Sequence, residues 1–335
     1  MSNLSLMIRR EIWPLAKPFV IARGSRSETE VVQVTIAQGV LFGLGECVPT
    51  PRFGESVSGV IDAIESIRDK LITFSGELSQ CRQQLQHWLP AGAARNALDC
   101  ALWDLAAKAE QTSVAQQLSL IEPKNITTVQ TISIDSPENM GKAAALLKNL
   151  PLLKIKLNEE LVLERLNAVH ENAPKAKLLI DANESWNIVL LEHVAKSIKH
   201  LPIVLIEQPL KANQDEILKG KSFSVPIGAD ESCHTCSDIP YLAQRYDVIN
   251  IKLDKCGGLT EGVQMAKLAK SNGLQVMVGC MVGTSLSMAP GLILATQASY
   301  VDLDAPLLIK VDRPFGLQIN NGNIKNLPVE LWGHP

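Results

Sequence analysis

The stretch that decides the fold lies between residues 177 and 254, where short apolar runs each end in charged residues. Residues 177–183 read KLLIDAN, residues 203–209 read IVLIEQP, residues 225–231 read VPIGADE, and residues 248–254 read VINIKLD. Runs rich in Ile, Leu and Val are typical of strands buried on both faces, as in parallel sheets. The pattern therefore predicts parallel strands whose carboxyl ends carry reactive side chains.

The same alternation of strand and helix extends in both directions from this stretch. It comprises the β-rich runs Ile126–Ile134, Leu152–Leu157, Lys177–Asp181, Ile203–Glu207, Val225–Asp230, Val248–Leu253, Leu274–Cys280 and Tyr300–Leu303. Amphipathic segments such as Glu159–Glu171 separate them, which predicts a (β/α)7β barrel of the TIM type, an α/β fold. An open doubly wound sheet is the alternative. It would require a GxGxxG turn after its first strand, and the sequence contains none.

The first third of the chain has a different pattern of expected strands and helices. Strands are expected at Leu4–Trp13, Glu30–Ala37 and Val40–Cys47, with a flexible polar loop over Pro18–Glu28. Apolar residues recur at helical spacing within Ala93–Glu110. An antiparallel meander followed by a helical layer is an α+β unit.

These patterns of expected secondary structure divide the chain into three parts. We expect an α+β capping domain over residues 1–124, the barrel over residues 125–306, and a tail over residues 307–335 that returns to the capping domain. The 335 residues are 46% apolar and carry a net charge of −3, which excludes a disordered chain. The same charge balance argues against a nucleic-acid partner and against attraction to anionic lipid.

Neither a signal peptide nor a membrane span is expected. The first ten residues alternate polar and apolar side chains, and no apolar run is long enough to cross a bilayer. The seven cysteines are scattered and odd in number, which favours reduced thiols in a cytoplasmic protein.

Charged residues at the strand ends form the candidate site, because the carboxyl ends of barrel strands meet at one rim. Asp181, Glu207 and Asp230 end three successive strands, and they would repel one another unless a cation lay among them. Oxygen ligands without His or Cys suit a hard ion, so Mg²⁺ is the first choice. Taken singly, each carboxylate could instead cap a helix or pair with an arginine.

Two lysines flank these carboxylates along the barrel order. Lys156 precedes them by one strand and Lys252 follows them by one, so the pair could act as base and acid on opposite faces of one carbon atom. Lys154 shares a strand face with Lys156, and a neighbouring ammonium group would lower the pKa of Lys156. The alternative is that each lysine is an ordinary rim residue.

The aspartate pair near the end of the barrel, the cysteines and the histidines point less clearly to a function. Asp302 and Asp304 lie on one face after the last barrel strand and could bind an ammonium group, although turn or cap aspartates fit equally well. Cys233 and Cys236 have CxxC spacing without a second ligand pair, and the six histidines form no zinc motif. Zinc chemistry is therefore not expected.

Together these residues resemble one known family. The motifs that carry the resemblance are Lys154-x-Lys156, Asp181-x-Asn183, Glu207-Gln208-Pro209, Ala229-Asp230-Glu231-Ser232 and Asn250-Ile251-Lys252. They are similar to those of the enolase superfamily, muconate lactonizing enzyme subgroup, over nearly the whole chain. The resemblance implies an isomerase that uses one Mg²⁺ per subunit, held by Asp181, Glu207 and Asp230. It also implies catalysis by Lys156 and Lys252, with Lys154 beside them.

A narrower resemblance comes from Pro18–Glu28, Ala93–Leu105 and Asp302-x-Asp304, which look like those of the bacterial dipeptide epimerases that act on L-Ala-D/L-Glu. It implies that Asp302 and Asp304 receive the dipeptide ammonium. It also implies that Arg23 or Arg26 binds the side-chain carboxylate, and that the enzyme degrades murein peptides in the cytoplasm. The alternatives are an N-acylamino acid racemase, an o-succinylbenzoate synthase, a muconate cycloisomerase or a non-catalytic barrel binding protein. The sequence leaves open whether the chain forms a homo-oligomer.

Overall fold

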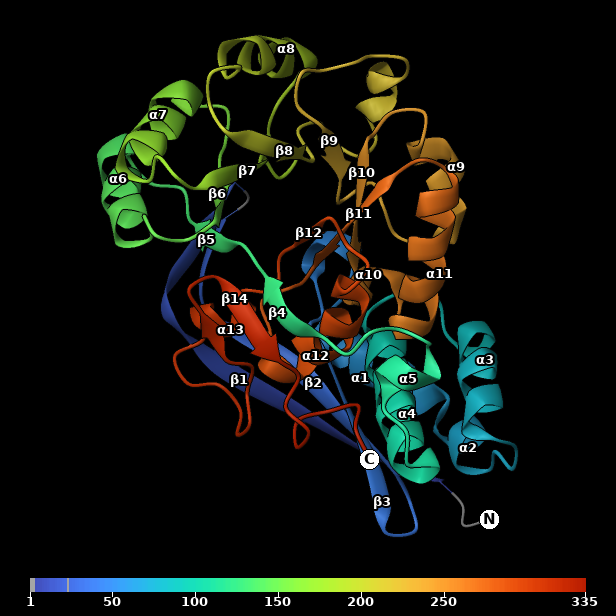
Figure 1. The fold of residues 1–335 in the computed structure, drawn as a ribbon. Coiled ribbons are helices and arrows are strands. Elements are labelled where there is room, and N and C mark those ends of the chain that lie inside the picture. Colours follow the sequence, from blue (N-terminus) through green and yellow to red (C-terminus); the bar gives the residue numbers. More distant parts are fainter. Residues whose placement is uncertain (1–3, 23) are drawn as a thin grey trace.

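The computed structural model describes residues 4–22 and 24–335, and its largest element is an eight-stranded parallel sheet curled into a barrel (Figure 1). Each strand pairs with the next along the chain. The strands are β5 (Gln130–Ile132), β6 (Leu152–Lys156), β7 (Lys177–Asp181), β8 (Ile203–Glu207), β9 (Ile227–Ala229), β10 (Val248–Lys252), β11 (Gln275–Gly279) and β12 (Tyr300–Val301). The predicted barrel is confirmed, and every predicted run contains one of these strands.

Two hydrogen bonds close the barrel between its first and last strands. The amide of Val129 donates to the carbonyl of Val301 at 2.9 Å, and the amide of Leu303 donates to Thr128 Oγ1 at 3.0 Å. Inside the barrel, buried apolar side chains including Leu179, Leu205 and Met277 form a separate small core. The interior is therefore packed below the rim, and ligands have access only at an open end.

Helical segments connect successive strands and cover the outside of the barrel (Figure 1). They are α6 (Pro137–Leu146), α7 (Val162–Asn172), α8 (Ile188–Ser197), η2 (Asp215–Leu218), η3 (Cys236–Asp238) with α9 (Ile239–Leu242), α10 (Leu253–Cys256) with α11 (Leu259–Ser271), and α12 (Ser285–Ala295). Side chains of Ser136, Asn187 and Thr284 cap the first turns of α6, α8 and α12. These caps satisfy amides that have no partner within the helix. Of the helices in the described ranges, none is long and apolar enough to cross a membrane.

The capping domain consists of an antiparallel sheet covered by helices. Its elements are β1 (Leu4–Ile21), β2 (Gly24–Gln38), β3 (Leu41–Cys47), η1 (Pro51–Phe53), α1 (Val57–Ser66), α2 (Arg68–Ile72), α3 (Leu78–Trp88), α4 (Ala93–Glu110) and α5 (Val114–Gln117). Gly43 and Gly45 let β3 lie directly on α4, because an added Cβ would come within 2.1 Å of Ala101 O or 2.0 Å of Ala97 O. The Gly-x-Gly pair therefore allows close contact between strand and helix.

The expected polar loop within Pro18–Glu28 is mostly paired strand, apart from a turn at Ala22 and from Arg23, which lies outside the described residues. After a bulge between Pro14 and Phe19, β1 pairs with β2 again, with Phe19 opposite Arg26 and Ile21 opposite Gly24. The two strands form one long ribbon, and the carbonyl of Val20 accepts from the amide of Ile134 in the barrel at 3.4 Å. Local composition suggested a loop, whereas tertiary contact with the barrel supports a strand here.

The short helix α13 (Ala305–Leu308) leads from the barrel into the tail, and the tail then pairs with a strand that precedes the barrel. The strands β13 (Ile319–Asn320) and β14 (Asn323–Asn326) join β4 (Lys124–Thr127) in a small antiparallel sheet. Beyond it, the indole of Trp332 donates to the carbonyls of Leu44 and Cys100 in the capping domain, at 3.0 and 3.1 Å. The domain boundaries at 124/125 and 306/307 stay a prediction.

Candidate active site

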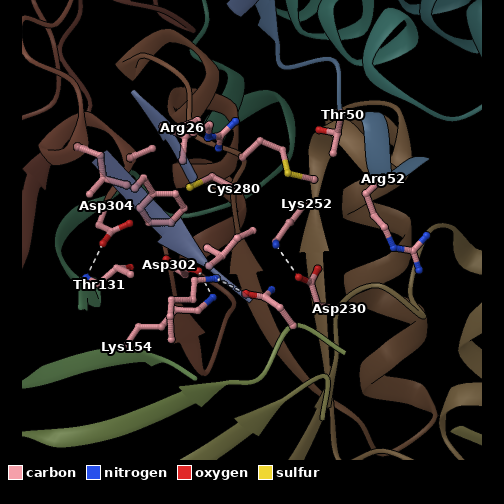
Figure 2. Close-up of a pocket in the computed structure, with 18 of the residues that line it drawn as sticks. Arg26, Thr50, Arg52, Thr131, Lys154, Asp230, Lys252, Cys280, Asp302 and Asp304 are labelled. Atoms are coloured by element: carbon pink, nitrogen blue, oxygen red, sulfur yellow. Dashed lines mark hydrogen bonds and ion pairs between the residues drawn. The ribbon is translucent and has the colours of Figure 1, made fainter. Parts of the chain in front are cut away.

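A pocket lies at the carboxyl ends of the barrel strands, beneath the capping domain (Figure 2). The barrel contributes charged side chains to its lining, and the capping domain contributes Phe19, Ile21, Arg26, Thr50, Arg52 and Phe53. The long β1–β2 ribbon and η1 thus form one side of the pocket. Both domains are needed to enclose it.

The three carboxylates predicted as metal ligands come from neighbouring strands and are buried. Asp181 ends β7, Glu207 ends β8 and Asp230 follows β9, with residue exposures of 0%, 0% and 2%. Burial and the charge of Asp181 raise the pKa of Glu207 to about 7. That effect shows that the carboxylates interact electrostatically, as expected for groups gathered at one place.

Lysine ammonium groups contact these carboxylates. Lys154 Nζ lies 3.0 Å from Asp181 Oδ2 and 2.7 Å from Glu207 Oε2, and Lys156 Nζ lies 2.6 Å from Asp181 Oδ2. These carboxylates therefore point toward lysine side chains. Within residues 4–22 and 24–335, no three side chains of His, Cys, Asp or Glu lie close enough together to hold a metal ion. The donor set itself, three buried carboxylates without nitrogen or sulfur, still suits a hard divalent cation. The ligand assignment stays a prediction.

Lys156 and Lys252 occupy opposite sides of the barrel. They end β6 and β10, which are four strands apart in the eight-stranded order, with the three carboxylate-bearing strands between them. Both side chains are 9% exposed, whereas that of Lys154 is 2% exposed. All three line the pocket, but Lys154 is the most enclosed. Side chains that end strands on opposite sides of a barrel can reach opposite faces of a carbon atom bound between them.

Nearby carboxylates govern the pKa values of Lys154 and Lys252. The predicted effect of Lys154 on Lys156 stays a prediction. Burial would lower the pKa of Lys154, but the charges of Asp181, Asp302 and Glu207 outweigh it and hold the pKa well above its usual value. The pKa of Lys252 is likewise raised, because Asp230 and Glu207 outweigh burial. The carboxylates decide the sign, so any cation that shared them would weaken their hold on the ammonium groups.

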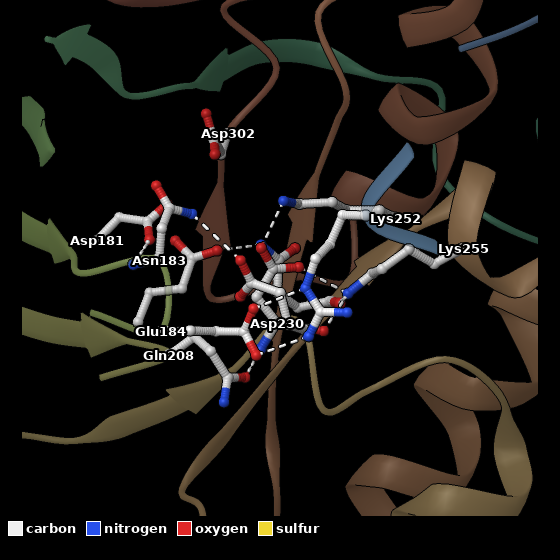
Figure 3. A network of polar contacts seen from close by, with 12 residues as sticks. Asp181, Asn183, Glu184, Gln208, Asp230, Lys252, Lys255 and Asp302 are labelled. Atoms are coloured by element: carbon white, nitrogen blue, oxygen red, sulfur yellow. Dashed lines mark hydrogen bonds and ion pairs between the residues drawn. The ribbon is translucent and has the colours of Figure 1, made fainter. Parts of the chain in front are cut away.

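Asp230 is fixed from several directions (Figure 3). Lys252 Nζ donates to its Oδ2 at 2.6 Å, and Lys255 Nζ donates to its Oδ1 at 2.6 Å. Gln208 Oε1 accepts from the Asp230 amide at 2.8 Å, and Asn250 donates to Glu207 Oε1 at 2.7 Å.

The sequence interpretation gave no role to Lys255, Gln208 or Asn250. One signal was present, because Asn250 lies two residues before Lys252 on one strand and therefore shares its face.

Asp302 and Asp304 both reach the pocket, but they have different partners. Asp302 Oδ2 accepts from Lys154 Nζ at 2.6 Å, and Asp304 Oδ2 accepts from the amide of Thr131 at 2.7 Å (Figure 2). Burial and the neighbouring charge of Asp302 raise the pKa of Asp304 to about 7. A cationic ligand beside this pair would relieve the repulsion between them.

The arginines divide between two sides of the pocket. Arg26 lies at the edge of the pocket with an exposed side chain, and its guanidinium carbon lies 5.9 Å from the centroid of the Phe19 ring. Arg52, which the sequence interpretation missed, makes a bidentate pair with Glu184 at 2.8 Å for both contacts. The predicted role of Arg23 falls on a residue outside the described part of the chain.

The CxxC segment takes no part in the pocket. Cys233 is buried, Cys236 is half-buried, and both are free thiols. His234, between them, packs edge-on against Phe53 with ring centroids 5.3 Å apart. The segment thus supports η1, which carries pocket residues.

Two family models match this chain. The one described as Mandelate racemase / muconate lactonizing enzyme, N-terminal domain, covers residues 3–119, and the one described as Enolase C-terminal domain-like covers residues 140–323. An L-Ala-D/L-Glu epimerase of Escherichia coli is 44% identical over 322 residues, 96% of this chain and 99% of that protein. An N-acetyl-D-glutamate racemase of a Pseudoalteromonas species is also 44% identical, over 90% of this chain and 95% of that protein.

Solved structures that are similar to this chain include the following two. An enolase family member of Agrobacterium tumefaciens, described as having homology to dipeptide epimerases and containing sodium and L-Ala-L-Glu, is 44% identical. The similarity has a TM-score of 0.93 and covers 98% of this chain and 100% of that one. A dipeptide epimerase of Enterococcus faecalis, complexed with Mg and L-Leu-L-Tyr, is 27% identical with a TM-score of 0.92, over 99% of each chain.

Proposed function

This chain belongs to the mandelate racemase / muconate lactonizing enzyme family, and from that premise we propose that it is a Mg²⁺-dependent isomerase that interconverts L-Ala-L-Glu and L-Ala-D-Glu. The observation that carries the proposal is the placement of Lys156 and Lys252 on opposite sides of one pocket. Inversion of a carbon centre requires a proton to leave on one face and return on the other, and this placement provides a group for each face.

The reacting proton is the α-proton of the glutamate residue. Its neighbour is already a carboxylate, so its removal produces a dianionic enediolate and is very unfavourable in water. Asp181, Glu207 and Asp230 would hold the ion, and bound Mg²⁺ supplies positive charge that stabilises the negative charge developing on the substrate carboxylate. One of Lys156 and Lys252, in its neutral amine form, accepts the α-proton, and the other, as an ammonium group, donates a proton to the opposite face. Lys154, held by Asp181, Glu207 and Asp302, contributes a fixed positive charge beside them.

The remaining charged groups of the pocket match the two ends of the dipeptide. Arg26, on the side of the capping domain, would bind the γ-carboxylate of glutamate. Asp302 and Asp304 follow β12, the strand diametrically opposite the Glu207 strand β8. A dipeptide whose terminal carboxylate lay near Glu207 would extend its ammonium group toward this aspartate pair.

The relative that acts on N-acetyl-D-glutamate gives a specific reason to weigh a second substrate. N-acetylglutamate shares the glutamate moiety but has no ammonium group. Asp302 and Asp304 favour the dipeptide, because an ammonium group beside them would offset the repulsion that raises the pKa of Asp304. The enzyme should epimerise L-Ala-L-Glu at least tenfold more efficiently than it racemises N-acetyl-L-glutamate, by about the value of one charge-assisted hydrogen bond. Chiral chromatography of the glutamate released by acid hydrolysis measures both reactions, and the reverse preference would overturn the dipeptide assignment.

A role in degrading murein peptides in the cytoplasm completes the proposal. It is supported by the chemistry of the substrate, which joins L-Ala to a D-configured residue. It is also supported by seven free cysteines, five of them buried, as expected in a reducing compartment.

A further inference from the structure

We propose that Thr29 and Glu46 of the capping domain are positioning residues that fix one wall of the active-site pocket, the segment Cys280–Thr284. We call this segment the β11–α12 wall, because it connects β11 to α12. Cys280, Met281 and Val282 of the wall line the pocket. The proposal deepens the proposed function, since it assigns two residues remote from the reacting atoms to substrate binding.

The first attachment joins Thr29 to Val282. Thr29 lies on β2 with 2% exposure, and its hydroxyl donates to the carbonyl of Val282 at 2.6 Å. Val282 packs with Leu15 and Ile309 in a small core between the capping domain and the tail. A buried carbonyl needs a hydrogen-bond donor, and here the donor belongs to the other domain.

The second attachment joins Glu46 to Thr284. Glu46 is the penultimate residue of β3 and is 1% exposed. Its Oε1 accepts from the Thr284 amide at 2.8 Å, and its Oε2 accepts from the Thr284 hydroxyl at 2.5 Å. The guanidinium of Arg313, from the tail, lies 2.6 Å from the same Oε2 and balances the buried charge. Thr284 is also the N-cap of α12, so Glu46 holds the point where the wall becomes a helix.

Gly283 shows how closely the wall approaches Glu46. A Cβ at this position would lie 3.1 Å from Glu46 Oε1, 3.0 Å from Val48 Cγ2 and 2.4 Å from Ser287 Oγ. The wall therefore lies directly against the end of β3. Since it has neither helix nor strand structure of its own, its place is set by these contacts with the capping domain.

The test compares matched threonine variants by two measurements. Thr29→Val keeps the shape of the side chain and removes its donor, and Thr29→Ser keeps the donor. Thr35→Val is the control, because Thr35 lies six residues along the same face of β2 and its hydroxyl accepts from Gln33 Nε2 at 3.4 Å. Hydrogen exchange of the wall amides is followed by mass spectrometry without substrate, and steady-state kinetics are measured with L-Ala-L-Glu and Mg²⁺.

We expect Thr29→Val to speed exchange across residues 280–284 and to raise KM about three- to tenfold, with kcat changed less than about twofold. Glu46→Gln should shift exchange and KM in the same direction, whereas Thr29→Ser and Thr35→Val should behave as the unmodified protein. Unchanged exchange and KM in Thr29→Val would overturn the proposal, as would an equal effect of Thr35→Val. Because exchange is measured without substrate, it decides the positioning role even if the unmodified protein fails to epimerise dipeptides, a result that would contradict only the proposed function.

Discussion

Lys154 Nζ lies 2.6 Å from Asp302 Oδ2, and this contact joins the carboxylates on one side of the barrel to the aspartate pair on the other. The same ammonium contacts Asp181 and Glu207, so one buried cation links both ends of the proposed dipeptide site. A substrate ammonium beside Asp302 would share that carboxylate with Lys154. Charge at the two ends of the site is therefore coupled through one side chain.

This coupling predicts a preference for a free amino terminus. N-acetyl-L-Ala-L-Glu should react with a kcat/KM about one to two powers of ten below that of L-Ala-L-Glu, because it lacks a charge-assisted contact worth about 1.5–3 kcal/mol. The double variant Asp302→Asn with Asp304→Asn should reduce the preference, measured as the ratio of the two kcat/KM values. Asp69→Asn, exposed on α2, serves as a carboxylate control. Equal reaction of both substrates with the unmodified protein would rule out the ammonium role and favour an N-acylamino acid racemase.

The two-lysine arrangement predicts a characteristic pair of defects. Lys156→Ala and Lys252→Ala should each reduce epimerisation by at least about three powers of ten, because one face of the α-carbon loses its acid–base group. Each variant should still exchange the α-proton of one isomer with solvent, detected by NMR in D₂O. Lys267→Ala, on the exposed face of α11, should leave both reactions intact. Near-normal epimerisation by either active-site variant would show that a single base serves both faces.

The carboxylate set predicts dependence on a divalent cation. Chelation should abolish turnover and added Mg²⁺ should restore it, while Mg²⁺ raises the melting temperature of the unmodified protein by mass action. Glu207→Gln and Asp230→Asn should weaken Mg²⁺ binding at least about tenfold in calorimetry, because each removes a charged oxygen ligand. Glu192→Gln, in an exposed ion pair with Lys221, is the matched control. Undiminished Mg²⁺ affinity in both active-site variants would place the ion elsewhere.

The position of Arg26 predicts how the enzyme selects the side chain of its substrate. Arg26→Ala should raise KM for L-Ala-L-Glu roughly tenfold or more and change KM for L-Ala-L-Gln little, since only glutamate carries a γ-carboxylate. The same pair of measurements on Arg23→Ala separates the two arginines named by the sequence, and Arg9→Ala supplies an exposed control. Equal effects on the Glu and Gln substrates would assign Arg26 a structural role instead.

Asp254 predicts a pH dependence of stability. It is 7% exposed and accepts from the Val48 amide and Asn96, and burial raises its pKa to about 7. Between pH 4 and 7 the folded protein therefore holds a proton that the unfolded chain releases, so stability falls as pH rises through this window. Asp254→Asn keeps the acceptor oxygen but cannot ionise.

The melting temperature of Asp254→Asn relative to the unmodified protein should accordingly rise from pH 4.5 to pH 7.5, a gain of up to about 4 kcal/mol in unfolding free energy. Asp62→Asn, exposed on α1, should show no such trend. A constant difference across the pH range would mean that Asp254 is ionised throughout.

Much of the site could be predicted because buried parallel strands can be recognised in a sequence as apolar runs. The charged residue that ends each run is expected at the barrel rim, and Lys156, Asp230 and Lys252 do line one pocket. Resemblance to a known family then supplied the reaction.

The remainder depended on contacts between distant segments. Composition suggested a loop at Pro18–Glu28, because the barrel that supports the β1–β2 ribbon is remote in sequence. Lys154 was expected to act on Lys156, yet the partners of Lys154 itself are Asp181, Glu207 and Asp302, at the ends of three other strands. Arg52 and Lys255 likewise find their partners Glu184 and Asp230 only through the fold.

The central claim is that this pocket removes and returns the α-proton of glutamate in a dipeptide. Incubation of L-Ala-L-Glu with the protein and Mg²⁺ in D₂O, followed by ¹H NMR, measures that step directly. The account predicts that the glutamate α-proton signal disappears as deuterium enters and that signals of L-Ala-D-Glu grow, while the alanine α-proton is retained. An α-proton signal of full intensity after prolonged incubation with Mg²⁺-loaded, folded protein would contradict the account.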